Sequence, residues 1–251
     1  MAVALEQVGS GSLVLILGIE TATERVSVAI GGHDGVVALA EVTRGRRHAE
    51  NLMPAIDDVC RSADVSVSEF GCVAVDVGPG LFTGMRVGVA TAKALAMALD
   101  LPIVVATSLE LLAHALRDDV EHVHDRLVCS VVDARKGEVF RQLYRVSADE
   151  VTAVDEPRCE SPDELVALLR ERAQAVVCAG DGARRYADVL TFDHRIAIAG
   201  ERWAYPSADA LVRLAHRRSL REDWHEPDRV EALYLRQPDA QINWTTRNDP
   251  S

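Results

Sequence analysis

Residues 77–96, VGPGLFTGMRVGVATAKALA, decide how this sequence of 251 residues is interpreted. An apolar run at 72–77 predicts a buried strand, and Gly78-Pro79-Gly80 then predicts a tight turn into a helix over 84–99. Backbone amides at such a turn could hold an anion, since they sit at a helix N-terminus. The sequence has no G-x-x-x-x-G-K-[ST] motif, and Lys93 lies about three helical turns beyond the glycines. The pattern therefore favours a structural turn over a phosphate loop.

Small residues recur at every fourth position of this helix, at Gly84, Gly88, Ala92 and Ala96. That spacing places them on one face. Glycine inside a helix costs about 1 kcal/mol relative to alanine, so the two glycines need a packing reason. Two interpretations remain open, namely tight packing within the domain and a subunit interface. The residues of the interface hypothesis are Gly84, Met85, Arg86, Gly88, Val89, Ala92, Leu95, Ala96 and Leu99.

Two similar hairpins flank this region and predict two related α/β lobes. Residues 13–30 read as a buried strand, a polar turn and an alternating strand, and residues 126–145 repeat that order. The acids Glu20 and Asp133 fall at matching points. We expect an N-terminal tail at 1–12, a first lobe at 13–110 with the partner-binding helix, a second lobe at 111–236 and a C-terminal tail at 237–251.

Composition excludes some classes of function. The net charge of −12 and the pI near 5.1 argue against unaided binding of nucleic acid, whose affinity comes mostly from lysine and arginine. No apolar run reaches the roughly 20 residues that span a bilayer, and the weakly apolar N-terminus carries no basic residue before it. We expect a cytoplasmic protein without membrane contact.

Several segments together resemble the bacterial TsaB (YeaZ) family, which is paralogous to the TsaD family. They are LGIETATERVSVAI (17–30), RRHAENLMPAIDDV (46–59), VDVGPGLFTGMRVGVATAKALA (75–96), VVDARKGEVF (131–140), AGDGA (179–183) and EALYLR (231–236). TsaD-like proteins carry an H-x-x-x-H metal pair. Here His48 is followed four residues later by Leu52, so one ligand is missing and no metal site is expected.

The resemblance implies an actin-like ATPase (ASKHA) fold of two lobes, each a mixed β-sheet with flanking helices. In nucleotide-using members, acids at the two hairpin turns flank the phosphates and the metal. Alternatively, the two acids have only a structural role in the turns, because their carboxylates accept hydrogen bonds from backbone amides. The candidates for a vestigial nucleotide site are Glu20, Thr21, Thr23, Gly78, Gly80 and Asp133.

The resemblance also implies a function. TsaB-like chains are non-catalytic partners of a TsaD-like subunit that forms N6-threonylcarbamoyladenosine next to the anticodon of tRNAs reading codons that begin with A. A TsaE-like ATPase binds the pair. ATP or ADP and metal are expected on these partner subunits and not on this chain, tRNA contact is indirect or shared, and a homodimer is possible. The rival interpretations are an independent ATP-dependent phosphotransferase or ATPase, motivated by Glu20 and Asp133, and a metallopeptidase, motivated only by His48.

Overall fold

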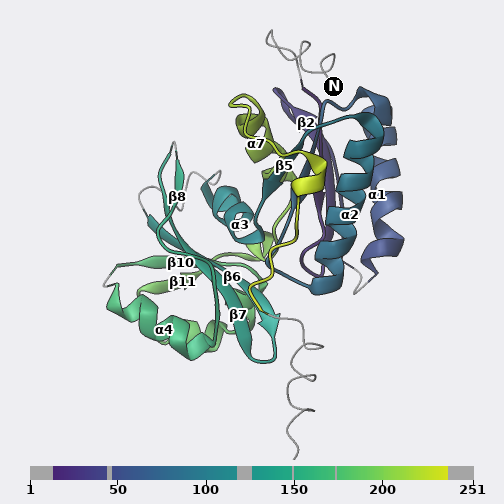
Figure 1. The fold of residues 1–251 in the computed structure, drawn as a ribbon. Helices are drawn as coiled ribbons and strands as arrows, with labels where there is room; N and C mark the ends of the chain where they lie inside the picture. Colours follow the sequence, from purple (N-terminus) through teal and green to yellow (C-terminus); the bar gives the residue numbers. More distant parts are fainter. Residues whose placement is uncertain (1–13, 44–46, 118–125, 149, 173, 237–251) are drawn as a thin grey trace, which may run out of the picture.

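The computed structural model describes residues 14–43, 47–117, 126–148, 150–172 and 174–236, and it shows two lobes, each built on one mixed β-sheet (Figure 1). The expected tails at 1–12 and 237–251 lie outside the described residues. None of the helices in these ranges is both long and apolar enough to span a bilayer.

The first sheet has the strand order β3-β2-β1-β4-β5. Strands β1 to β3 form an antiparallel meander, whereas β4 and β5 run parallel to β1. Both faces are covered, so β1 and β4 are buried along their whole length, and each is apolar up to the acid at its last position. The strands are β1 (Ile16–Glu20), β2 (Val26–Gly32), β3 (Gly35–Val42), β4 (Cys72–Asp76) and β5 (Ile103–Ala106).

Helices α1 (His48–Ala63) and α2 (Phe82–Leu99) cover one face of this sheet, and α7 (Ala208–Ser219) covers the other (Figure 1). On the α1 and α2 side, Leu52 and Val89 meet Ile19 in a buried core. A short 3-10 helix, η2 (Val67–Glu69), leads from α1 into β4. The two helices therefore form a layer whose outer side faces away from the sheet.

The second sheet has the order β11-β10-β6-β7-β8, and β9 also pairs with β7. Its strands are β6 (Arg126–Arg135), β7 (Glu138–Val146), β8 (Val151–Ala153), β9 (Arg158–Glu160), β10 (Val176–Ala179) and β11 (Ile196–Ile198). Helix α3 (Ser108–Arg117) packs on one face. Helices α4 (Pro162–Glu171), α5 (Asp181–Arg185) and α6 (Ala187–Leu190) pack on the other. The remaining 3-10 helices are η3 (Glu201–Trp203) and η4 (Pro227–Arg229).

The two sheets share one topology. Read from the opposite edge, the second sheet is β8-β7-β6-β10-β11, so a central strand with a hairpin on one side and parallel strands on the other occurs twice. Strands β1 and β6 are the two central strands; Glu20 is the last residue of β1, and Asp133 lies two residues before the end of β6. The repeat that the two hairpins predicted is therefore a repeat of whole sheets.

The expected lobe boundaries need a correction. Residues 208–219, assigned to the second lobe by their place in the sequence, form α7 and pack on the first sheet. Val230 also joins the core of the first lobe. The chain therefore crosses back to the first lobe after η3, because α7 supplies the apolar cover that the second face of the first sheet requires.

The AGDGA segment at 179–183 joins the end of β10 to the start of α5. Gly180 has a φ of +116°, and the residues after it begin the short helix α5. Strands β8, β9 and β11 had no signal in the sequence, because three-residue strands are too short to show a period of two.

Candidate functional site

The Gly78-Pro79-Gly80 turn is held by contacts within the first lobe. Asp76, at the end of β4, accepts hydrogen bonds from the Gly78 amide (2.7 Å) and from the Ser108 hydroxyl (2.8 Å to Oδ2). A Cβ atom at Gly80 would lie 2.0 Å from the carbonyl oxygen of Ala22. Because the turn lies directly against the backbone of the first hairpin, the structure favours the structural turn over the phosphate loop.

The small residues of α2 face their own sheet. A Cβ atom at Gly84 would lie 2.1 Å from the Thr21 carbonyl oxygen, and one at Gly88 would lie 2.3 Å from Thr21 Oγ1. The Thr21 hydroxyl donates a hydrogen bond to the Gly84 carbonyl oxygen (2.8 Å). Ala92 and Ala96 are buried in the same core. This corrects the hypothesis that the small residues face another chain, since close packing within the lobe explains them.

The other residues of the interface hypothesis divide between the two sides of α2. Met85 and Val89 are buried, so they contribute no free surface. Arg86 is exposed, and Leu95 and Leu99 are half-buried. Of the original set, only the last three therefore remain open to a partner.

The opposite side of α2 forms an exposed surface that the sequence reading missed. We call it the α2 outer face; its residues are Phe82, Arg86, Ala90, Ala94 and Met97. Met97 is 67% exposed, an unusual position for a large apolar side chain in a helix that is otherwise well packed. The sequence shows the spacing of four from Arg86 through Ala90 to Ala94. It does not indicate which of the two helix faces with small residues packs against the sheet.

An aromatic and cationic cluster lies at the start of this face. The Arg86 guanidinium lies over the Phe82 ring, 3.8 Å from its centroid, and Arg86 Nε donates to the Tyr234 hydroxyl (3.1 Å). The ring centroids of Phe82 and Tyr234 are 5.3 Å apart. The segment that carries the late EALYLR motif therefore packs against the N-terminal end of α2.

Glu20 and Asp76 form a pair of buried acids. Glu20 has no exposed surface, its Oε1 accepts from the Ala22 amide (2.8 Å), and its Oε2 has no hydrogen-bond partner among the described residues. Burial, and secondly the Asp76 carboxylate, raise the pKa of Glu20 well above its usual value. Burial also raises the pKa of Asp76 to about 7.

Thr23 and His48 stabilise the turn between β1 and β2. The His48 ring is buried, and its Nε2 lies 2.6 Å from the Thr23 carbonyl oxygen; since a carbonyl only accepts, Nε2 carries the proton. Thr23 Oγ1 accepts from the Arg25 amide (3.4 Å). Across the described ranges, no three His, Cys, Asp or Glu side chains are grouped so that they could hold a metal.

Asp133 is engaged by arginines of its own lobe. Its Oδ2 lies 2.9 Å from Arg135 Nη1 and 3.3 Å from Arg185 Nη1. The Asp133 amide donates to Asp181 Oδ1 (2.9 Å), and burial raises the pKa of Asp181 to about 6. The sequence-predicted acid is thus partnered, and its neighbours Arg135, Arg185 and Asp181 are contacts that the sequence did not reveal.

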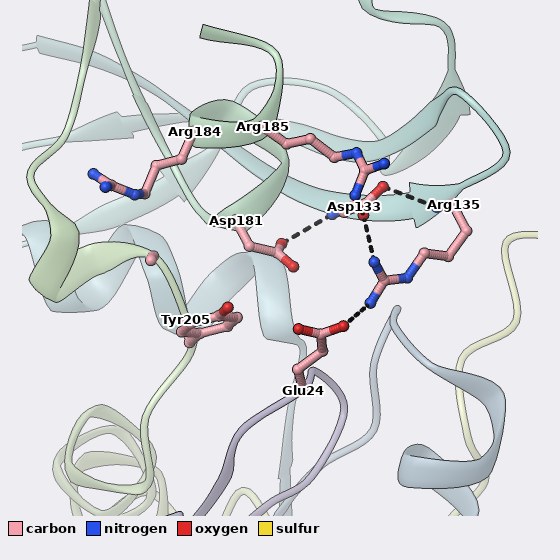
Figure 2. A pocket seen from close by; sticks show the side chains of 8 residues that line it. Glu24, Asp133, Arg135, Asp181, Arg184, Arg185 and Tyr205 are labelled. Carbon is pink, nitrogen blue, oxygen red and sulfur yellow. Dashed lines mark hydrogen bonds and ion pairs between the residues drawn. The ribbon is translucent and has the colours of Figure 1, made fainter. Parts of the chain in front are cut away.

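A cavity of about 320 Å³ lies between the lobes (Figure 2). It is lined by Glu24, Asp133, Arg135, Asp181, Arg184, Arg185, Ala204 and Tyr205. Of the candidates for a vestigial nucleotide site, Asp133 lines this cavity, whereas Glu20, Thr21, Thr23, Gly78 and Gly80 do not. The structure therefore does not gather the predicted set around this cavity.

Two lobes of matching topology, with a cleft between the turns of their central hairpins, define the actin-like ATPase (ASKHA) fold. The family model described as TsaD, tRNA N6-adenosine threonylcarbamoyltransferase, matches residues 40–244. The TsaB protein of Bacillus subtilis is 28% identical over 235 residues, which cover 91% of this chain and 97% of that protein. The TsaB protein of Escherichia coli is 28% identical over 226 residues, 88% of this chain and 94% of that protein.

A solved structure agrees with these relatives. YeaZ from Pseudomonas aeruginosa superimposes with a TM-score of 0.76 at 26% identity, over 89% of this chain and 100% of that one. The chain therefore belongs to the TsaB (YeaZ) family of tRNA threonylcarbamoyladenosine biosynthesis proteins, which is related to TsaD.

Proposed function

We propose that this chain is a non-catalytic subunit that binds a TsaD-like protein and supports its formation of N6-threonylcarbamoyladenosine in tRNA. One observation carries the proposal beyond family membership. Glu20 is fully buried and Asp133 is paired with arginines of its own lobe, whereas the α2 outer face is exposed.

The two acids and the glycine turn do not form a phosphotransfer site. A phosphotransfer site needs a metal, a phosphate cradle and a nucleoside grip at the same time. Glu20 is buried with a raised pKa, and Asp133 is paired with Arg135 and Arg185. The Gly78-Pro79-Gly80 turn packs against Ala22. We therefore assign ATP, ADP and metal to the partner subunits, including a TsaE-like ATPase.

The α2 outer face has the composition of a surface that binds a partner protein. Aromatic side chains, methionine and arginine are enriched at protein interfaces, and Phe82, Met97 and Arg86 supply one of each. Ala90 and Ala94 between them let another helix approach closely. Met53 of the adjacent helix α1 is 49% exposed, so this helix also presents a large apolar side chain to solvent. A second copy of this chain could use the same surface when the partner is absent.

Reconstitution of the modification tests this function. A mixture of tRNA, threonine, bicarbonate, ATP, the synthase of threonylcarbamoyl-AMP, the TsaD-like and TsaE-like proteins, with or without this chain, is assayed for the modified nucleoside by mass spectrometry. We expect product only in the complete mixture, and none when this chain replaces the TsaD-like protein. Equal product without this chain, or product from this chain without the TsaD-like protein, would contradict the proposal.

A further inference from the structure

We propose that a network of ion pairs, in which the Glu24–Arg135 pair crosses between the two hairpin turns, holds the lobes closed by the chain's own charges. We call it the inter-lobe ion-pair network; its residues are Glu24, Asp133, Arg135 and Arg185. The inference concerns the conformation of this chain and goes beyond the proposed function.

One guanidinium bridges the two lobes. Glu24 lies in the turn between β1 and β2, and Arg135 ends β6 at the corresponding turn of the second lobe. Arg135 Nη2 lies 2.5 Å from Glu24 Oε1, and its Nη1 lies 2.9 Å from Asp133 Oδ2 (Figure 2). The two turns therefore touch through a charged pair.

The backbone of the second turn directs Arg135 toward the first lobe. Arg135 and Lys136 have φ values of +65° and +55°, a left-handed conformation that non-glycine residues seldom adopt in succession. The Arg135 amide donates to Asp133 Oδ1 (3.0 Å), which fixes this conformation. The side chain consequently leaves the end of β6 toward Glu24, as Figure 2 shows.

The surroundings of the network strengthen its pairs. The Asp133 side chain is 3% exposed and that of Arg135 is 29% exposed, so solvent screens this pair less than a pair on the open surface. Arg185 adds a second cation at Asp133 (3.3 Å). The pair that crosses the cleft joins Glu24 to Arg135, and the Glu24 side chain is 40% exposed. We therefore expect salt to weaken mainly this pair.

A second connection lies beside the network. Arg25, next to Glu24, donates from Nη2 to the carbonyl oxygens of Tyr205 (3.1 Å) and Pro206 (2.7 Å). These two residues lead from η3 into α7, where the chain returns to the first lobe. The first hairpin turn is thus attached both to the second hairpin and to the connecting segment.

The charges around the cleft balance one another. The cavity lining contains three acids, Glu24, Asp133 and Asp181, and three arginines, Arg135, Arg184 and Arg185. The carboxylates of Glu24 and Asp133 are already paired with Arg135 and Arg185. They would repel an anionic ligand that bound near these arginines, since like charges at close range repel. The arrangement favours closure over recruitment of an anion.

Packing accounts for only one side of the contact between the lobes. Helix α3 contacts both β6 of the second sheet and α7 of the first lobe, so it joins the lobes through apolar side chains. The inter-lobe ion-pair network joins them at the turns that face the cleft. Loss of Glu24 or Arg135 should therefore let the cleft open while each lobe stays folded.

Pulsed electron-electron resonance on the full chain tests this inference. Nitroxide labels are placed on exposed positions of α1 and α4 by Ser62→Cys and Ala167→Cys, after Cys60→Ser and Cys159→Ser remove the two half-buried thiols. We expect one narrow distance distribution for this labelled chain. Glu24→Gln and Arg135→Met should each broaden it and shift it to a different mean distance. The double variant should show no further change beyond Arg135→Met, since that substitution already removes the pair that crosses the cleft.

Two controls separate the network from general damage. Arg145→Met removes an exposed arginine from β7 of the same lobe, and the distribution should not change. In about 1 M NaCl the screening length is about 3 Å. The distance distribution of the labelled chain should therefore broaden there without any substitution at the network. Unchanged distributions in Glu24→Gln, in Arg135→Met and in high salt would overturn the inference and assign closure to packing alone.

Discussion

Thr21 is the residue that determines how α2 sits on the first sheet. Its carbonyl oxygen leaves no space for a Cβ atom at Gly84, and its hydroxyl leaves none at Gly88. Its side chain also bonds to the Gly84 carbonyl oxygen. The cost of two glycines in a helix is thus offset by close approach to one buried threonine.

Gly84→Ala should destabilise the protein, because its Cβ atom would lie 2.1 Å from a backbone oxygen that cannot rotate away. We expect a loss of about 1–3 kcal/mol in the free energy of unfolding, measured by urea denaturation, as for other overpacked cores. Intrinsic helix propensity alone predicts a gain of about 1 kcal/mol. Ala94→Gly on the exposed side is the matched control and should cost about 1 kcal/mol. A Gly84→Ala protein as stable as the unsubstituted chain would refute the packing account.

Asp76 should impose a pH dependence on stability. Its pKa is raised to about 7 by burial, so between about pH 4 and pH 7 the folded chain holds a proton that the unfolded chain has released. The free energy of unfolding should therefore fall as the pH rises through this window, by up to about 1.4 kcal/mol per pH unit from this group. Glu20, whose pKa is also raised, acts in the same direction.

Asp76→Asn isolates this contribution, since the amide oxygen still accepts from Gly78 but does not titrate. The difference in unfolding free energy, unsubstituted minus variant, should fall from pH 4 to pH 7. His114, whose pKa burial lowers to about 3, acts in the opposite direction and is common to both proteins, so it cancels. Parallel stability curves for the two proteins would show that Asp76 is charged when folded.

At the scale of elements, the sequence predicted the position of α2 but not its orientation. The helix is apolar almost all round, so its hydrophobic period gives little direction. Small residues spaced four apart lie along two of its faces, one with Gly84, Gly88, Ala92 and Ala96 and the other with Ala90 and Ala94. The choice depends on Thr21, whose contact with the helix joins residues 63 positions apart and has no local signature.

The C-terminal segment should depend on one lysine of α2. Lys93 Nζ donates to the carbonyl oxygens of Asp228 (3.2 Å) and Val230 (3.0 Å), and Val230 is buried in the core of the first lobe. Lys93→Met should therefore speed amide hydrogen exchange over residues 228–233, measured by mass spectrometry. Arg61→Met, which removes a cation from exposed α1, should leave exchange there unchanged. Equal exchange in both variants would mean that apolar packing alone holds the segment.

At the scale of the whole molecule, the repeated hairpin predicted two lobes because strand, turn and strand leave a local pattern. The return of the chain to the first lobe through α7 was not predictable, since an amphipathic helix carries no mark of which sheet it will cover. The same limit applies to the cleft. Glu20 and Asp133 stood out at their turns, whereas the contact between Glu24 and Arg135 joins residues 111 positions apart.

The central claim is that the α2 outer face binds the TsaD-like partner, and complex formation with α2 variants tests it most directly. Size-exclusion chromatography with light scattering would compare the unsubstituted chain, Ala94→Glu on α2 and the control Ala167→Glu on exposed α4, each mixed with the TsaD-like protein of the same organism. We predict a stable mixed complex for the unsubstituted chain and for Ala167→Glu, and separate folded proteins for Ala94→Glu, since a buried unpaired carboxylate opposes association. A complex that persists with Ala94→Glu, or no complex with the unsubstituted chain even when ATP and the TsaE-like protein are present, would contradict the account.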